Sequence, residues 1–167
     1  HNGWDEGFCA RLGAHRDAGY GAVVMINANM PEFMESYFQL VESWVPDCRL
    51  NARKFYGCRG AMSNARASNV CLLLHWGRWP GEQLISCLGW MAHFFYDYYQ
   101  FTGDREFLEK RAVPLMKEVA LFYEDLLAGT EDKNGKYRFF IGYSPEHRLS
   151  ANTTFDIGVA RAMLSYL

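Results

Sequence analysis

The sequence predicts an all-α fold in which helices buried on every face alternate with amphipathic helices. Between Gln83 and Phe101 only Asp97 carries a full charge, so this stretch is apolar on nearly every side and predicts a buried helix. A later stretch confines its apolar residues to one stripe opposite charged residues, which predicts a helix with one face in solvent. A double ring of helices has this alternation, with covered inner helices and half-exposed outer ones.

The first third of the chain predicts one extended segment followed by a helical region. Residues 1–20 are rich in Gly, and their pattern assigns them to no particular type of element. The segment from Tyr20 to Asn29 is predicted to be extended because several of its residues are β-branched. A helix is predicted to begin near Pro31, to be interrupted at Pro46 and to end at Gly57.

The middle of the chain predicts a loop and then the helices that define the fold class. Residues 57–70 are small and polar and predict a loop, and Asp104 is placed to cap the helix that follows the buried one. Pro114 is expected to break or kink that helix. An amphipathic helix is then predicted to end near Gly129, with an apolar stripe made of Leu115, Val119, Phe122, Tyr123, Leu126 and Leu127.

The last part of the chain predicts a β-hairpin and a final helix. The pair Asn134-Gly135 is a strong turn signal, so we expect a short β-hairpin near residues 134–143, with Lys136–Ile141 as one strand. Thr153 or Thr154 is expected to cap the last helix. Four apolar residues of that helix are predicted to point inward: Ala160, Met163, Leu164 and Leu167.

Composition limits the classes of function. A formal charge of −2 over 167 residues, with no basic block, argues against nucleic acid as a partner. No stretch predicts a membrane span, and we expect no membrane partner. Five cysteines show neither a CxxC pair nor Cys/His metal spacing, so we expect buried free thiols and neither a metal nor another cofactor. By length residues 1–167 form a single domain; the chain starts without Met and stops inside a helical pattern, so we expect part of a longer protein.

The segment around Glu146 is the strongest candidate for chemistry. Pro145 restricts its own φ and pushes Ser144 toward an extended conformation, so Glu146 follows a stiff corner. Aromatic residues crowd the approach to this corner, among them Phe139 and Tyr143. Because a carboxyl beside aromatic walls loses hydration, we expect its pKa to rise toward that of a general acid. The alternative is a solvated loop glutamate without a catalytic role.

Five segments together resemble glycoside hydrolase family 95, a group of inverting α-L-fucosidases and related α-L-galactosidases built on an (α/α)6 toroid. The resemblance begins near residue 20, extends to the end of the chain and keeps the family's order. The matching segments are Ile26-Asn27 with Met30, Gly57-Cys58-Arg59-Gly60, Trp90 to Asp104 with Phe107-Leu108, Ser144-Pro145-Glu146, and Asn152 to Ile157. The resemblance implies a partial toroid, about half of the barrel.

The resemblance implies roles for two catalytic residues. Glu146 matches the family's general acid, which protonates the leaving oxygen in an inverting glycosidase. Asn27 matches the second asparagine of a pair that positions the attacking water, but Met25 stands where the first would be; Asn29 could replace it only if the strand shifts. The family's general base lies further downstream, so the isolated chain is expected to be inactive. Asp156 matches a motif residue at a helix start, where helix capping is favoured over catalysis.

Other residues are candidates for holding a sugar. Trp90 matches a tryptophan of the family and would either stack on a sugar ring or fill the core. Trp76 and Trp79 lie in a turn-rich loop and are further candidate platforms. Asn64 stands where the family's sugar pocket is lined by a different run of residues, which puts fucose specificity in question. His147, next to Glu146, completes the candidate set.

The predicted function is therefore hydrolysis of a terminal sugar, α-L-fucoside- or α-L-galactoside-like, from an oligosaccharide or glycoconjugate glycan. One alternative is a carbohydrate-binding or structural helical domain without turnover. Another is a phosphorylase or polysaccharide lyase on a similar toroid, which phosphate dependence or an unsaturated product would reveal. The family resemblance alone favours an extracytoplasmic location. Arg59 is predicted to brace its loop by binding a carboxylate or carbonyls. The lone histidines His75 and His93 are expected to be core or loop residues and not catalysts.

Overall fold

The computed structural model describes the backbone of residues 2–5, 8–15, 20–26, 30–65, 84–140, 142–143 and 149–167, with side chains from residue 32 onward in these ranges. The chain divides into two compact units, residues 1–41 and 42–167. No helix in these ranges has the length and apolar character that crossing a membrane requires.

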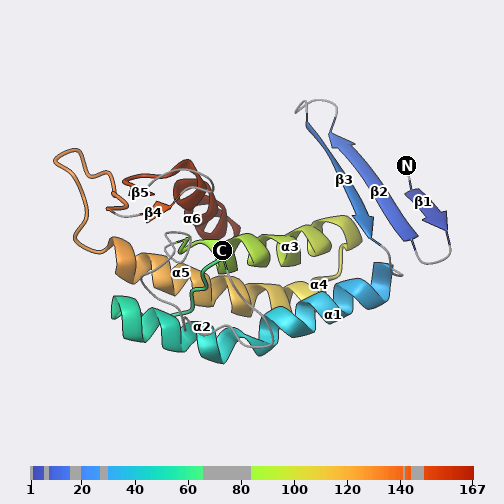
Figure 1. Ribbon diagram of the computed structural model, residues 1–167, viewed down its shortest axis with the longest axis horizontal. Coiled ribbons are helices and arrows are strands. Elements are labelled where there is room, and N and C mark those ends of the chain that lie inside the picture. The colour runs from blue at the N-terminus through green and yellow to red at the C-terminus, as the bar shows by residue number, and fades with distance from the viewer. Residues whose placement is uncertain are drawn as a thin grey trace. The chain divides into compact units, whose positions relative to one another are not determined.

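The first unit contains a three-stranded antiparallel sheet followed by the start of a helix (Figure 1). Strands β1 (Asn2–Asp5), β2 (Phe8–His15) and β3 (Tyr20–Ile26) pair in chain order. The extended segment predicted from Tyr20 is therefore confirmed as far as Ile26, whereas the Gly-rich sequence before it gave no sign of β1 and β2. Helix α1 (Met30–Ser43) begins one residue before Pro31, as the sequence predicts.

The second unit begins with the end of α1 and continues with a helix that ends at a glycine. Helix α2 (Val45–Asn51) has Pro46 in its first turn and continues into the π-helical segment η1 (Ala52–Tyr56). Gly57 ends this helix with φ +67°, a left-handed conformation that glycine adopts without steric cost. Both helix boundaries that Pro46 and Gly57 predict are confirmed.

The central helical pair is α3 and the long rod that follows it. Helix α3 (Cys87–Thr102) ends at Gly103, and the Asp104 carboxylate accepts a hydrogen bond from the Phe107 backbone N–H at 2.9 Å, which confirms Asp104 as a cap. The rod consists of α4 (Arg105–Phe107), the π-helical segment η3 (Leu108–Ala112) and α5 (Val113–Leu127).

The helical rod continues through Pro114, so the expectation of a break was wrong, while the alternative of a kink stays a prediction. The π-helical segment η3 ends immediately before α5, and Pro114 lies in the first turn of α5. Proline lacks a backbone N–H, but in the first turn of a helix that N–H needs no partner within the helix. The π-helical segment η3 and α5 thus follow each other without a loop between them, with Pro114 inside the first turn of α5.

The small second sheet lies at the end of the predicted hairpin range and beyond it. A tight turn forms at Asn134-Gly135, where the Asp132 carboxylate accepts hydrogen bonds from the backbone N–H groups of Asn134 and Lys136. Residues 136–140, however, form no strand. The paired strands are β4 (Gly142–Tyr143) and β5 (Leu149–Ser150), and helix α6 (Thr154–Tyr166) follows with Thr153 as its cap.

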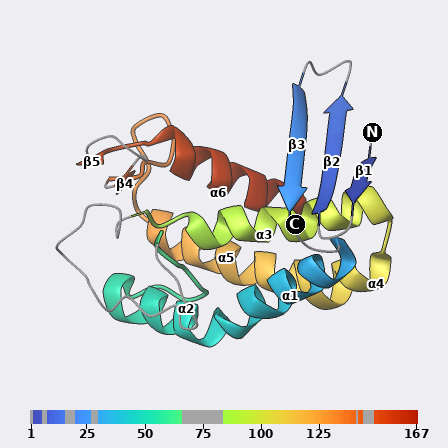
Figure 2. The same ribbon diagram turned by 45° about the vertical axis from the view of Figure 1, so that its right-hand side comes forward.

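Helices α3, α5 and α6 lie side by side and form the core of the second unit (Figures 1 and 2). Fully buried side chains come from each of them, including Leu88, Phe95, Phe122 and Met163. Burying one such side chain contributes roughly 1.5–3 kcal/mol. In α6 the inward direction predicted for Ala160 and Met163 is confirmed, but Leu164 and Leu167 are each 52% exposed.

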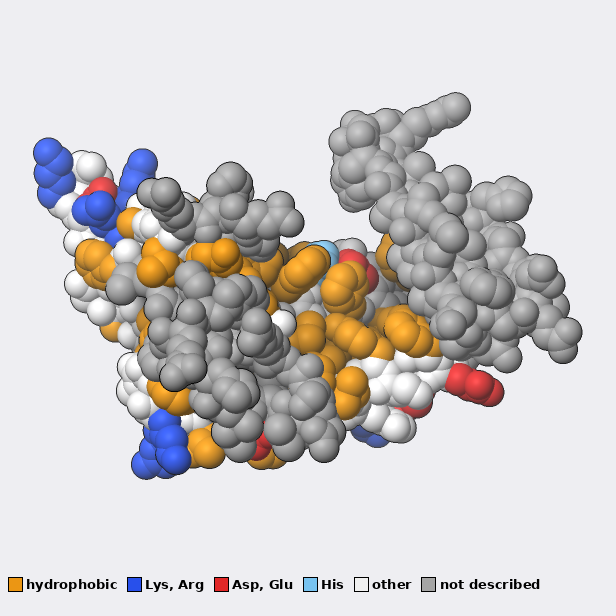
Figure 3. Space-filling view, viewed as in Figure 1, with side chains coloured by type: hydrophobic (Ala, Val, Ile, Leu, Met, Phe, Trp, Pro, Cys, Tyr) orange, Lys and Arg blue, Asp and Glu red, His pale blue; other side chains and the backbone are white. Residues whose placement is uncertain are grey.

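Helix α3 is not buried on every face, contrary to the expectation from its composition. Leu88 and Phe95 are fully buried, yet Trp90 is 53% exposed, Phe94 41% and Phe101 66%. Other hydrophobic side chains are also exposed on the face of the second unit that Figure 3 shows. Part of the aromatic surface of α3 is therefore exposed to solvent. An apolar composition indicates that a helix face is suited to contact, but it does not indicate whether another part of the protein covers that face.

The turn Gly57-Cys58-Arg59-Gly60 is braced against α5. The Arg59 guanidinium donates to both oxygens of Asp125 and to Glu124, with a shortest contact of 2.7 Å to each partner. The Arg59 backbone N–H also donates to Asp125 at 2.7 Å. These bonds confirm the bracing role predicted for Arg59, and the Arg59 side chain holds the pKa of Asp125 at about 2, below the usual 3.8.

The brace predicts a specific acid sensitivity. Because the pKa of Asp125 is lower in the folded protein, its stabilising contribution is present above its unfolded value of 3.8 and is lost as the pH falls toward about 2. We expect Asp125→Asn to lower the free energy of unfolding at neutral pH. Between pH 3.8 and about 2 the free energy of unfolding of this variant should then decrease less steeply than that of the unmodified protein. Urea denaturation at a series of acidic pH values tests this, with Glu106→Gln as a control for loss of an exposed carboxylate. An equally steep fall in Asp125→Asn would contradict the prediction.

Candidate functional site

The hairpin β4–β5 brackets the segment that the sequence singles out. Gly142 pairs with Ser150 and Tyr143 with Leu149, so residues 144–148 connect the two strands in sequence. Glu146 and His147 belong to this connection and lie outside the described residues. The described residues do show what holds its two ends.

The chain entering the hairpin is attached to the start of helix α6. The Phe139 backbone N–H donates to the Asn152 side-chain oxygen, and the Asn152 backbone N–H donates to the Phe139 carbonyl, both at 2.9 Å. Phe139 itself is only 7% exposed. Asn152 has φ +56°, a left-handed conformation that asparagine tolerates better than most residues. This reciprocal pair fixes the chain three residues before β4.

Asp156 lies directly beneath the hairpin and is completely buried. Its carboxylate accepts one hydrogen bond from the Ser86 hydroxyl and one from the Thr153 hydroxyl, each at 2.6 Å. Burial raises the pKa of Asp156 above its usual range, and these two hydrogen bonds oppose the rise. Because Ser86 precedes α3 and Thr153 caps α6, this one carboxylate joins the starts of two helices.

Trp90 lies one turn into α3 from Ser86 and is 53% exposed. Its indole meets the Phe155 ring edge-on, with ring centroids 5.7 Å apart, and lies 6.5 Å from the Phe94 ring. The structure therefore presents Trp90 as a partly open aromatic surface held by neighbouring rings, not as a fully buried core residue. Such a surface can stack on the apolar face of a sugar.

The other predicted site residues are divided between the described and the undescribed parts of the chain. Asn64 is buried, with 6% of its surface exposed. Asn27 and Asn29 follow the end of β3 and lie outside the described residues, as do Trp76 and Trp79. Within the described ranges, no three His, Cys, Asp or Glu side chains are placed to hold a metal ion.

Sequence reasoning missed a second polar cluster, on the other half of α3. The His93 ring lies 3.5 Å from the Asp97 carboxylate through Nε2 and 2.8 Å from the Tyr166 hydroxyl through Nδ1. Burial raises the pKa of Asp97, and the neighbouring His93 opposes this rise. The spacing of His93 and Asp97 was a visible i, i+4 signal, whereas the contact with Tyr166 comes from a helix far along the chain.

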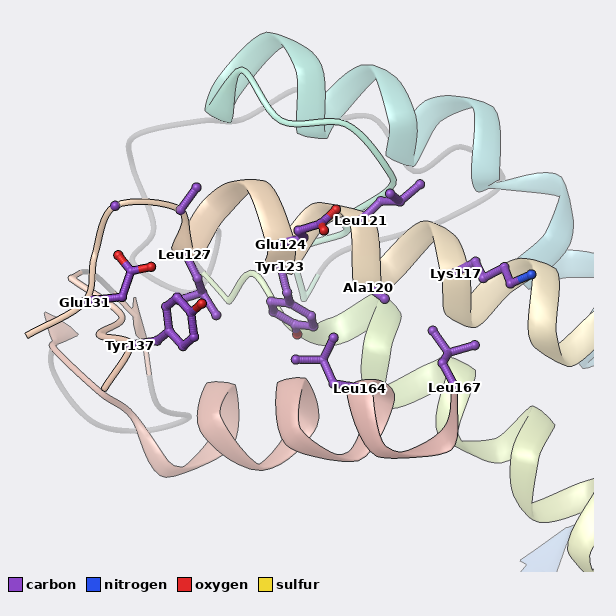
Figure 4. A pocket seen from close by; sticks show the side chains of 12 residues that line it. Lys117, Ala120, Leu121, Tyr123, Glu124, Leu127, Glu131, Tyr137, Leu164 and Leu167 are labelled. Carbon is purple, nitrogen blue, oxygen red and sulfur yellow. The ribbon is translucent and has the colours of Figure 1, made fainter. Parts of the chain in front are cut away.

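An open pocket of about 680 Å³ lies between α5, the turn after it and the end of α6 (Figure 4). Tyr137, Leu164 and Leu167 line it together with side chains of α5, among them Lys117 and Glu124. Most of these lining side chains are apolar. None of the predicted catalytic or sugar-binding residues lines this pocket.

Comparison with known proteins shows what the chain is similar to. Residues 24–166 match the model of the glycosyl hydrolase family 95 catalytic domain. The chain is also 24% identical over 153 residues to Alpha-L-fucosidase 2 of Arabidopsis thaliana, in an alignment that covers 82% of this chain and 17% of that relative. The chain thus spans about a sixth of the length of this curated relative.

Proposed function

The chain belongs to the glycosyl hydrolase family 95 catalytic domain, and on that premise we propose that the protein containing it removes a terminal sugar from a glycan by hydrolysis with inversion. The substrate we propose is an α-L-fucoside- or α-L-galactoside-like unit of an oligosaccharide or glycoconjugate. Catalytic domains of this family are (α/α)6 toroids, and the α3, α5 and α6 bundle is consistent with part of one.

The observation that carries this proposal is the junction at Asp156. Through Ser86 and Thr153 it joins the start of α3 to the start of α6. The exposed indole of Trp90 and the hairpin that brackets Glu146 both extend from this junction. A glycosidase needs a proton donor and a platform for the sugar ring close together, and the junction supports such an arrangement.

In the proposed reaction Glu146 donates its proton to the glycosidic oxygen as the bond to the anomeric carbon breaks. A water attacks the opposite face of that carbon and loses its proton to a general base. We propose that Asn27 helps to position this water, with Asn29 as a neighbour able to replace part of its bonding. The sugar ring would stack on the indoles of Trp90, Trp76 and Trp79. It would also contact the side chains of Asn64 and His147. No step of this scheme uses a metal.

Activity is tested with aryl α-L-fucosides and aryl α-L-galactosides, using the longer protein that contains this chain. We expect free sugar without any need for phosphate, and proton NMR should detect the β-anomer first because the configuration inverts. Release of the α-anomer first would contradict inversion. Binding without turnover would favour the carbohydrate-binding alternative, and a sugar phosphate or an unsaturated sugar would indicate another type of toroid enzyme.

We further propose that the chain forms about half of the toroid and that the general base comes from outside residues 1–167. The partial coverage of the relative and the exposed aromatic surface of α3 support this arrangement. The 167-residue chain alone is then expected to release no sugar above a blank. The assay compares it with the longer protein on the same aryl glycosides, and turnover by the short chain would overturn this assignment.

A further inference from the structure

The carboxylate of Asp156 does more than the cap of helix α6 requires. The Thr153 hydroxyl already caps that helix by accepting a hydrogen bond from the Asp156 backbone N–H at 3.1 Å. The Asp156 side chain is not needed for this bond. It instead accepts two short hydrogen bonds, one from its own helix cap and one from Ser86, which lies 70 residues away in sequence. Two hydroxyl donors hold this buried carboxylate in one position relative to both helices.

The first residue of β4 packs against this carboxylate. A Cβ added to Gly142 would overlap the Asp156 Oδ2 atom and would lie 2.8 Å from the Thr153 Cγ2 atom. The backbone of the hairpin therefore touches the Asp156 and Thr153 side chains directly, and glycine is required for this approach. Together with the Phe139–Asn152 pair, this contact holds the chain at two places just before residues 144–148.

We propose that Asp156 is a positioning residue for the general acid, acting through Gly142 to set where the Glu146-bearing segment leaves the fold. Through Ser86 the same carboxylate ties that segment to the helix that carries Trp90. The described entry to that segment, Gly142, and the start of the helix that carries Trp90 then share one anchor, the Asp156 carboxylate. This inference rests on the proposed role of Glu146, and Asp156 itself touches neither the substrate nor the water.

A purely structural role for Asp156 makes a different prediction. Loss of stability reduces the amount of folded enzyme and lowers turnover of every substrate by the same factor. Misplacement of the acid instead harms only the substrates whose leaving group needs a proton. A shift of about 1 Å from a change away from the chemistry can cost on the order of 10²-fold in rate. The dependence on the leaving group therefore separates the two roles.

The test uses Gly142→Ala in the longer protein, with Gly158→Ala as the matched control. Gly158 lies in α6, and a Cβ there meets nothing within 4 Å, so the same chemical change creates no contact. We expect Gly142→Ala to lower kcat about 10- to 100-fold on an aryl glycoside with a poor leaving group. The loss should be several-fold smaller on a dinitrophenyl glycoside, KM should change little, and Gly158→Ala should retain full activity.

Asp156→Asn gives a second, independent test because the amide preserves the shape of the side chain while removing its charge. It should show the same dependence on the leaving group, measured on protein shown to be folded by circular dichroism. An equal loss on both glycosides, or no loss, in Gly142→Ala and Asp156→Asn would overturn the positioning role. Glu146→Gln is measured in parallel. If the loss of activity in Glu146→Gln depends on the leaving group while the losses in the other two variants do not, only the positioning role of Asp156 is wrong. If the loss in Glu146→Gln does not depend on the leaving group, the proposed role of Glu146 as the acid is wrong as well.

Discussion

Glu146→Gln is expected to reduce kcat/KM about 10²–10⁴-fold on substrates with poor leaving groups, a loss of about 3–5 kcal/mol of transition-state stabilisation. Glutamine preserves the size and hydrogen bonding of the side chain but cannot donate the acid's proton. The loss should shrink on glycosyl fluorides and dinitrophenyl glycosides, whose leaving groups need no proton. The measurement is kcat/KM for both substrate types in the longer protein.

Asn27→Ala is the matched comparison for this variant. It removes one proposed hydrogen bond to the attacking water, and Asn29 lies near enough in sequence to compensate. We expect a smaller loss that is the same for every leaving group. An equal loss on both substrate types in Glu146→Gln would show that Glu146 is not the acid.

Gly60→Ala is expected to have the largest effect on stability. Gly60 has φ +70°, and a Cβ there would overlap the Glu118 carbonyl oxygen and lie 2.6 Å from the Phe122 backbone nitrogen of α5. Both neighbours are helix backbone and cannot move aside. Overpacking and a left-handed conformation should together cost about 3 kcal/mol or more.

Gly57→Ala provides the control for this prediction. Gly57 also has a positive φ of +67°, but a Cβ there meets nothing within 4 Å. The free energy of unfolding of this variant should therefore fall only by the strain of the left-handed conformation, about 1–2 kcal/mol. Denaturant unfolding of the two variants measures the difference, and equal losses would mean that the contact of Gly60 with α5 contributes nothing.

Features set by short-range chemistry were predictable from the sequence. The ends of helices at Gly57, Asp104 and Thr153 follow from a glycine or a capping side chain within a few residues. The bracing role of Arg59 also followed from its turn, although its partner Asp125 is 66 residues away and could not be named.

Contacts between residues that are far apart in the sequence were not predictable. Nothing near Asp156 in the sequence reveals that Ser86 donates to it, and nothing near Gly142 reveals that a carboxylate lies against its backbone. The expectation for α3 failed for a related reason, because apolar composition does not say which faces the rest of the protein covers. Trp90 could therefore be read as core or as platform until its exposure was known.

The pH dependence of kcat/KM shows whether Glu146 is the acid of an inverting glycosidase. On an aryl glycoside whose leaving group needs a proton, the longer protein should give a bell-shaped profile whose basic limb reports loss of the acid's proton. We expect Glu146→Gln, measured on the same glycoside, to lose this basic limb and to keep the acidic limb set by the general base. A basic limb that persists unchanged in Glu146→Gln would assign the proton to another group, and Glu146 would then not be the acid.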